Sequence, residues 1–236
     1  MAMTITLQNT VNWSLPYIKN QPLQISNMEP ALTIGNMVLG LMIGPPMRWP
    51  FNRSSVAVNL IQGQQDTVVN LPTYGFLEGG TITDPAGGDT MPLQPRLYLQ
   101  KGGKVQGRPT EIAAQYDDGN GNITFRTKEV PGKNYTAALE FQRKCTLLQS
   151  LGSVWGPVSD EFSFIYDWGY LTMAGLLVND ARAPIFEKYF IGKLLGTQDG
   201  IDDQTRNIFL DNWQMMRRTI QRSDNMTTQG AAGRNV

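Results

Sequence analysis

The stretch SDEFSFIYDWGYLTMAGLLVNDARAPIFEKYFIGKLLG, residues 159–196, decides the class of the fold, because it predicts two consecutive helices. Ser159 is a suitable N-cap, and acidic residues follow it in the first turn. The residues after that turn are almost wholly apolar, which is typical of a buried helix. Pro184 stands where a second helix would begin, and Gly196 stands where it would end.

The helical pattern continues into a third helix, which begins at Asp202 and Asp203. The apolar face expected of the second helix comprises Phe186, Tyr189, Phe190 and Leu194, and that of the third comprises Phe209, Trp213, Met216 and Ile220. We interpret these side chains as core residues. Three consecutive helices with short connections predict a compact bundle over residues 144–222.

Residues 1–48 are expected to combine a short extended start with a single helix over residues 29–43. Pro30 lies in the first turn of this helix, the one helical location where proline is favoured. The apolar stripe consists of Ala31, Ile34, Val38 and Leu41. Gly35 and Gly40 inside the helix allow close approach of another part of the chain.

Residues 49–143 predict short β-strands separated by turn residues. The expected strands are SSVAVNLI (54–61), DTVVNL (66–71), YGFLEGGTIT (74–83), MPLQPRLYL (91–99), EIAAQYDD (111–118), NITFRTKEV (122–130) and NYTAALEFQ (134–142). Pro95 confines its strand to the edge of a sheet, because proline lacks the N–H donor. The fold class is therefore predicted as α+β. An antiparallel sandwich or barrel is inserted between one N-terminal helix and three C-terminal helices.

The segment AAQYDDGNGNITFR, residues 113–126, gathers four side chains with oxygen atoms, Asp117, Asp118, Asn120 and Asn122. A calcium-binding loop that started at Asp118 would need glycine at its sixth position, where Ile123 stands. Glycine and asparagine are instead the residues that tight hairpin turns prefer. We predict a β-hairpin and no metal site.

The composition excludes several classes of enzyme. The chain has no histidine, and Cys145 is its one cysteine, so neither Ser-His-Asp catalysis nor a cysteine or histidine metal site can be built. No phosphate-binding loop or dinucleotide-binding motif occurs. Carboxylate pairs remain as candidates for hydrolysis, and they are Asp117, Asp118, Asp160 and Glu161. Turn and helix-cap roles explain all four better, so we expect no enzyme activity and no cofactor.

Residues 223–236 are polar and glycine-rich, and they predict a flexible tail. Arg217, Arg218 and Arg222 precede the tail at the end of the third helix, and Arg234 lies within it. Basic side chains suit a helix C-terminus through the helix dipole. Alternatively, these four arginines dock onto an acidic protein surface or DNA.

The chain carries no strong net field, because 20 basic and 20 acidic residues cancel. Its most apolar run, WGYLTMAGLLV at 168–178, is only eleven residues long. A membrane-spanning helix needs about 20 residues. The start of the chain shows neither a basic region nor an apolar region typical of a secretory signal. The sequence therefore predicts a protein that does not cross a membrane.

Several segments resemble the head–tail adaptor family of tailed bacteriophages, also called tail tubular protein A-like neck proteins. They are LQNTVNWSLPYIKNQPLQI (7–25), PPMRWPFNR (45–53), YGFLE (74–78) and the long stretch from Val154 to Leu195. The aromatic pattern Trp49-Pro50-Phe51-Asn52 leads into the β region, and Trp155-Gly156-Pro157 leads into the later helices, as in that family. The resemblance covers most of the chain.

The resemblance implies a structural virion protein that forms a homo-oligomeric ring, expected to be dodecameric, in the neck of the virion. The ring would lie beneath the portal protein, join the capsid to a tail or nozzle protein, and line the conduit for double-stranded DNA. It would assemble in the host cytoplasm. A net charge of zero suits a conduit, because strong phosphate binding would hold back the genome. The alternatives are another virion part, such as a tail-tube, tail-terminator or minor capsid protein, and a carbohydrate-binding module.

Overall fold

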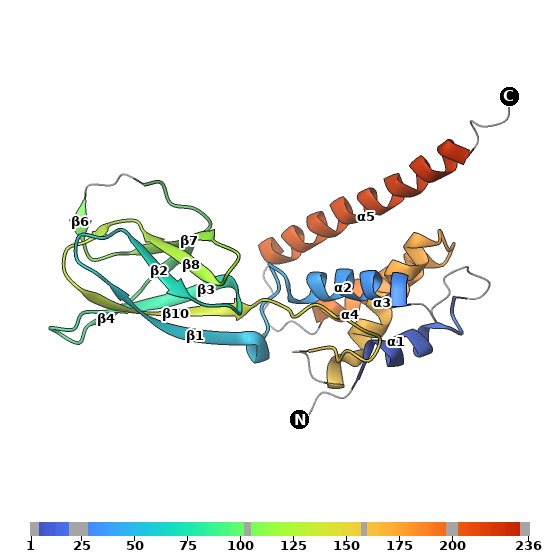
Figure 1. Cartoon of the computed structure of the whole chain (residues 1–236), viewed down its shortest axis with the longest axis horizontal. Helices are drawn as coiled ribbons and strands as arrows, with labels where there is room; N and C mark the ends of the chain where they lie inside the picture. Colours follow the sequence, from blue (N-terminus) through green and yellow to red (C-terminus); the bar gives the residue numbers. More distant parts are fainter. Residues whose placement is uncertain (1–4, 19–27, 102–104, 157–159, 197–202, 232–236) are drawn as a thin grey trace. The chain divides into compact units, whose positions relative to one another are not determined.

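The computed structural model describes residues 5–18, 28–101, 105–156, 160–196 and 203–231, with the backbone alone for residue 161 and for 219–231 (Figure 1). The fold is α+β, with five helices and several β-sheets among these residues. The chain divides into two compact units. We call Met1–Phe51 together with Cys145–Val236 the helical unit, and Asn52–Lys144 the β unit.

The helical unit draws its helices from both ends of the chain. They are α1 (Leu7–Ser14), α2 (Met28–Ile43), α3 (Ser163–Leu177), α4 (Ala183–Gly196) and α5 (Asp203–Ala231). A short 3-10 turn, η2 (Asp160–Phe162), leads into α3. A second turn, η1 (Pro50–Asn52), joins the two units. The core of the helical unit contains Trp49, Trp155 and Trp213, each at most 2% exposed.

Helix α1 corrects the prediction of an extended start. A capping box holds its first turn, because Thr6 Oγ1 accepts a hydrogen bond from the Asn9 backbone N–H and Asn9 Oδ1 accepts one from the Thr6 backbone N–H. Leu7 and Val11 are fully buried on one side of the helix. Asparagine replaces the usual Glu or Gln of a capping box. The N-terminal part therefore contributes two helices rather than one.

The C-terminal helices lie close to their predicted positions, with three corrections. Helix α3 begins at Ser163 with Phe162 as its N-cap, and the predicted N-cap, Ser159, lies outside the described residues. Phe186, Phe190 and Leu194 of α4 are buried as expected, but Tyr189 is half exposed. Helix α5 does not end at Arg222 and extends to Ala231. Most of the expected flexible tail, 223–236, is therefore helical, and residues 232–236 lie outside the described residues. A physical reason is that extending an existing helix avoids the unfavourable nucleation step, and no proline interrupts this stretch.

The β unit contains two four-stranded sheets and one two-stranded sheet. The strands are β1 (Arg53–Leu60), β2 (Asp66–Asn70), β3 (Tyr74–Thr83), β4 (Thr90–Pro92), β5 (Gln94–Arg96), β6 (Gln106–Gly107), β7 (Glu111–Asp117), β8 (Asn122–Thr127), β9 (Val130–Pro131) and β10 (Tyr135–Arg143). The sheet orders are β1-β10-β3-β4, β2-β8-β7-β5 and β6-β9. Both four-stranded sheets contribute to one core, which includes Val58, Leu139, Ile112 and Phe125.

The strand predicted over 91–99 is in fact two strands in different sheets. Strand β4 pairs antiparallel with β3, whereas β5 pairs parallel with β7. Leu93, between them, is 1% exposed, so its burial accompanies the passage of the chain from one sheet to the other. Strand β5 contains Pro95 and lies at a sheet edge, as predicted. The β6–β9 pair was not predicted, since a two-residue strand has no periodicity.

The hairpin predicted over 113–126 is confirmed. Strands β7 and β8 pair antiparallel, with Asp117 opposite Ile123. Gly119 and Gly121 have φ angles of +80° and +87°, which favour glycine. A Cβ atom at position 121 would also lie 2.8 Å from the Pro72 Cα atom, so the turn needs glycine for two reasons.

Candidate functional site

The arginines proposed to dock onto a partner have different environments. Arg217 is engaged within the helical unit, where its Nη1 atom lies 3.2 Å from Glu187 Oε2 of α4. The Trp213 indole N–H donates to Glu187 Oε1 at 2.7 Å. Glu187 therefore anchors α5 to α4. Arg217 therefore supports the fold of the helical unit, and this role makes it a weaker candidate for docking onto a partner.

The other three arginines are less constrained by what the structure describes. Arg218 is exposed on α5. The backbone of Arg222 is helical, but its side chain is not described, and Arg234 lies outside the described residues. Docking by these arginines stays a prediction.

The four candidate carboxylates are divided between the two units. Asp160 belongs to the helical unit, where its Oδ1 atom accepts a hydrogen bond from the Ile5 backbone N–H at 3.3 Å. The side chain of Glu161 is not described. Asp117 and Asp118 belong to the β unit, where Asp117 Oδ1 accepts from the Gly119 backbone N–H at 2.9 Å. Within the described residues, no group of three or more Cys, Asp or Glu side chains is placed to hold a metal ion.

We predict that calcium titration gives no saturable binding heat and no increase in melting temperature. Both oxygens of Asp118 already hold the hairpin. Oδ1 accepts from the backbone N–H groups of Asn120 and Asn122, and Oδ2 accepts from Asn122 Nδ2 at 2.7 Å. The same hydrogen bonds, first that from the Asn122 side chain, lower the pKa of Asp118. Ile123 is buried in the core, and it stands where a calcium-binding loop needs glycine for its sharp turn. A saturable site lost in Asp118→Asn would contradict this prediction.

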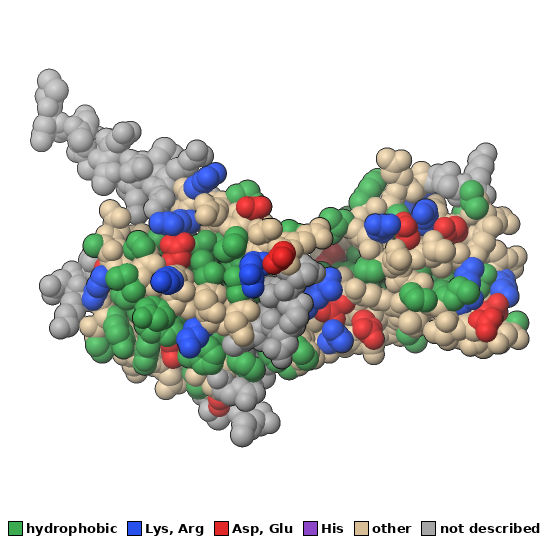
Figure 2. Space-filling model, turned by 180° about the vertical axis from the view of Figure 1, so that it is seen from behind, with side chains coloured by type: hydrophobic (Ala, Val, Ile, Leu, Met, Phe, Trp, Pro, Cys, Tyr) green, Lys and Arg blue, Asp and Glu red, His purple; other side chains and the backbone are tan. Residues whose placement is uncertain are grey.

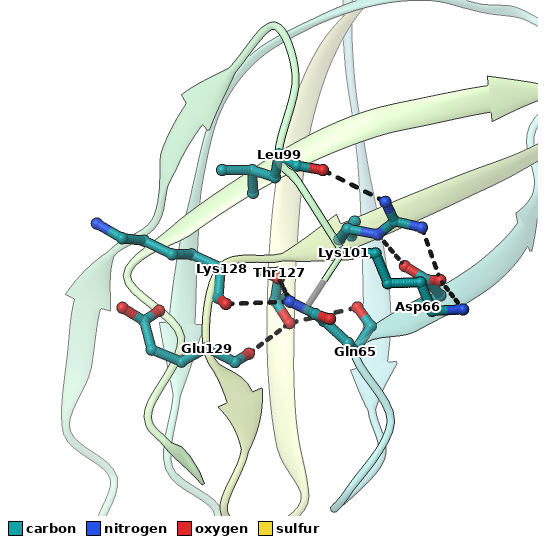
Figure 3. Close-up of polar contacts among 8 residues, drawn as sticks. Gln65, Asp66, Leu99, Lys101, Thr127, Lys128 and Glu129 are labelled. Atoms are coloured by element: carbon teal, nitrogen blue, oxygen red, sulfur yellow. Dashed lines mark hydrogen bonds and ion pairs between the residues drawn. The ribbon is translucent and has the colours of Figure 1, made fainter. Parts of the chain in front are cut away.

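A polar cluster joins β2, the end of β8 and the 99–101 segment (Figure 3). Asp66 forms a bidentate ion pair with Arg126, at 2.6 and 2.9 Å. Lys101 Nζ lies 3.7 Å from Asp66 Oδ2. Arg126 also donates to the Leu99 carbonyl. Gln65 Nε2 donates to the carbonyls of Thr127 and Lys128 at about the same distance, 3.0 and 3.1 Å. Because these contacts satisfy one another, we interpret the cluster as structural.

We expect Asp66→Asn to destabilise the β unit by about 1 kcal/mol at neutral pH, allowing for partial exposure. The hydrogen bonds from Arg126 lower the pKa of Asp66 in the folded state. The stabilisation is therefore present above about pH 4, the unfolded pKa, and is lost as pH falls through the lowered folded pKa. Denaturant unfolding followed by circular dichroism should show the two proteins converging in acid. Asp89→Asn, at an exposed position, serves as the control; a difference between wild type and Asp66→Asn that is independent of pH would contradict the prediction.

The helical unit exposes an aromatic surface that sequence reasoning missed. Figure 2 shows hydrophobic side chains gathered over this unit, with basic side chains among them. Tyr189 of α4 stacks on Trp168 of α3, with ring centroids 4.8 Å apart. Trp168 also contacts Trp13 of α1 at 5.5 Å, and Trp13 contacts Tyr17 at 4.9 Å. The rings form a continuous series from α1 to α4, and it ends at the half-exposed Tyr189.

The outward side of α4 is an open depression of about 590 Å3, lined by Pro184, Ile185, Lys188, Tyr189, Gly192 and Lys193. We call these six residues the α4 face. Ile185 is 55% exposed and Tyr189 is 50% exposed. Lys193 lies over the Phe164 ring at 5.7 Å from its centroid. The sequence signal that would have found this face is the presence of Lys188 and Gly192 beside Ile185, since a core helix face rarely contains lysine.

The outward side of α5 also carries apolar side chains. Phe209 and Trp213 face the core, each 1% exposed, whereas Ile208 and Met215 are 44% and 59% exposed. Asp211 lies between these two and is exposed. We call Ile208, Asp211 and Met215 the α5 stripe.

No known protein-family model matches this chain, and no curated protein matches it either. Among the described residues, no helix is long and apolar enough to cross a membrane.

Proposed function

We propose that this chain is a head–tail adaptor of a tailed bacteriophage. It is a structural virion protein without enzyme activity, and it forms a homo-oligomeric ring beneath the portal protein. In this proposal the helices from both ends of the chain make a bundle, and the two four-stranded sheets make a sandwich inserted between them. The ring joins the capsid to the tail or nozzle protein and lines the DNA conduit. The protein assembles in the host cytoplasm and remains in the neck of the virion.

The exposed surface of the helical unit carries this proposal. Tyr189 and Ile185 are each at least half exposed, beside two lysines. Exposed apolar patches with a polar rim mark protein-binding surfaces, and aromatic residues are enriched in the cores of such interfaces. A surface of this kind suits a protein whose task is to assemble with other subunits.

The segments that carry the family resemblance have a structural role consistent with the proposal. Trp49 stacks on Phe51 at 5.1 Å, and both lie near Phe162 at the start of the later helices. Trp155 stacks on Tyr166 of α3 at 4.1 Å. The two aromatic segments that flank the β unit in sequence therefore belong to the core of the helical unit.

Electron microscopy of the purified full chain, alone and mixed with the portal protein encoded by the same genome, tests the proposal. We expect ring-shaped particles that add a layer to the portal. Binding should not depend on calcium or on any added cofactor. A chain that neither forms rings nor binds the portal would contradict the proposal, and binding to a tail-tube protein alone would favour the alternative of another virion part.

A further inference from the structure

We infer that the α4 face of one copy of this chain binds the α5 stripe of a neighbouring copy. This inference rests on the proposed function and deepens it, because it names the contact by which subunits would join into a ring. Both surfaces belong to the helical unit.

The α4 face is an apolar depression bordered by positive charge. Ile185, Tyr189 and Gly192 lie at successive turns of α4, and Gly192 leaves space at one end because it has no side chain. Lys188 and Lys193 border this depression. A suitable occupant is therefore a helix with two apolar side chains and one carboxylate.

The α5 stripe has these features in matching order. Along α4, Ile185 is followed by Lys188 three residues later and by Gly192 seven residues later. Along α5, Ile208 is followed by Asp211 and Met215 at the same intervals. If the two helices run in the same direction, Ile208 meets Ile185, Asp211 meets Lys188, and Met215 fills the space at Gly192. Residues at these intervals share one side of a helix.

Tyr189 is held ready for such a contact. Its ring is stacked on Trp168, which in turn contacts Trp13, so little side-chain freedom remains to be lost on binding. Rigid aromatic side chains are the residues that contribute most at interfaces. Methionine side chains are unbranched and adapt to irregular surfaces, which suits Met215 to this depression.

The charges favour a head-to-tail arrangement over a symmetric pair. Two α4 faces placed together would oppose lysine to lysine, and two α5 stripes would oppose Asp211 to Asp211. Pairing an α4 face with an α5 stripe brings opposite charges together. When the α4 face of one copy binds the α5 stripe of another, the resulting pair still has one free α4 face and one free α5 stripe. Further copies can therefore be added in the same way, and the assembly closes into a ring if the rotation between neighbouring copies permits it.

A charge-swap experiment with the full chain tests the inference. Variant A carries Lys188→Glu and Lys193→Glu, and variant B carries Asp211→Lys. Each variant alone opposes like charges across the contact, so we expect its self-association constant in sedimentation to fall by about tenfold or more. An equimolar mixture of A and B should assemble again, and so should a single chain with all three changes. Lys144→Glu, at an exposed position in the β unit, is the charge control.

The outcomes separate this inference from the proposed function. Loss in A and in B with recovery in the mixture supports the inference. If A and B assemble as well as wild type, or if wild type stays monomeric up to near-millimolar concentration, the inference is wrong. Portal binding by wild type is measured in parallel. If the inference fails in either of these ways but wild type still binds the portal protein, the proposed function stands. If the mixture of A and B assembles again but wild type does not bind the portal protein, only the proposed function is contradicted.

Discussion

Gly169→Val is expected to destabilise the helical unit by about 3 kcal/mol or more, which exceeds the usual cost of a single added methylene in a core. A Cβ atom at position 169 would lie 2.6 Å from Val38 Cγ1 and 2.9 Å from Phe190 Cε2. Val38 and Phe190 are fully buried, so neither can move aside without displacing α2 or α4 from α3. The glycine is therefore required by close packing, although its backbone is helical.

Urea unfolding followed by tryptophan fluorescence measures this effect. All five tryptophans lie in the helical unit, so their emission reports on that unit alone. Gly40→Val is a matched control, because Gly40 is exposed on α2 and a Cβ atom there meets nothing within 4 Å. We expect the control to stay within about 0.5 kcal/mol of wild type. Equal effects at positions 169 and 40 would show that packing around Gly169 is not the cause.

Trp155→Ala is expected to reduce the stability of the same unit by about 3–5 kcal/mol, the range for deleting a buried aromatic side chain. Trp155 is 1% exposed and stacks on Tyr166. Its indole N–H donates to Thr10 Oγ1 at 3.1 Å, which links α1 to the segment before α3. Thr10 in turn hydrogen-bonds the Asp167 side chain, whose pKa is raised chiefly by burial.

Trp155→Phe separates the two contributions. It keeps an aromatic ring beside Tyr166 but removes the hydrogen bond to Thr10. We expect a smaller loss, about 1–3 kcal/mol, from the missing hydrogen bond to Thr10 Oγ1 and the reduced volume. Unfolding is again followed by fluorescence of the remaining tryptophans. A Phe variant as unstable as the Ala variant would assign the effect to the hydrogen bond, and an Ala variant near wild type would refute the prediction.

Much of the fold could be predicted because its signals are local. The alternation of β8 places Ile123 and Phe125 in the core, and the glycines at 119 and 121 specify its turn. Helix α1 was missed because Asn9 is a weak sign of a capping box. The break between β4 and β5 was missed because the burial of Leu93 between two sheets is a tertiary effect.

The candidate site was harder to predict because it depends on which side of a helix faces the core. Helix α4 has apolar residues almost all round, so periodicity alone could not separate the buried Phe190 from the half-exposed Tyr189. The structural role of Arg217, which was predicted as a docking residue, was missed because its partner, Glu187, lies 30 positions away in the sequence. Such a pair becomes visible only when α4 and α5 are brought together.

The first and last strands of the β unit have a consequence for how this gene can change. The chain enters through β1 and leaves through β10, and β10 pairs with β1 along the whole length of β1, with Arg53 opposite Gln142. Asn52 Nδ2 also donates to the Arg143 carbonyl at 2.8 Å. Because the two ends are neighbours, recombination at these borders could exchange the whole insertion for a foreign cassette. Each lineage could then diversify the insertion while the surrounding reading frame and its helical contacts are inherited unchanged.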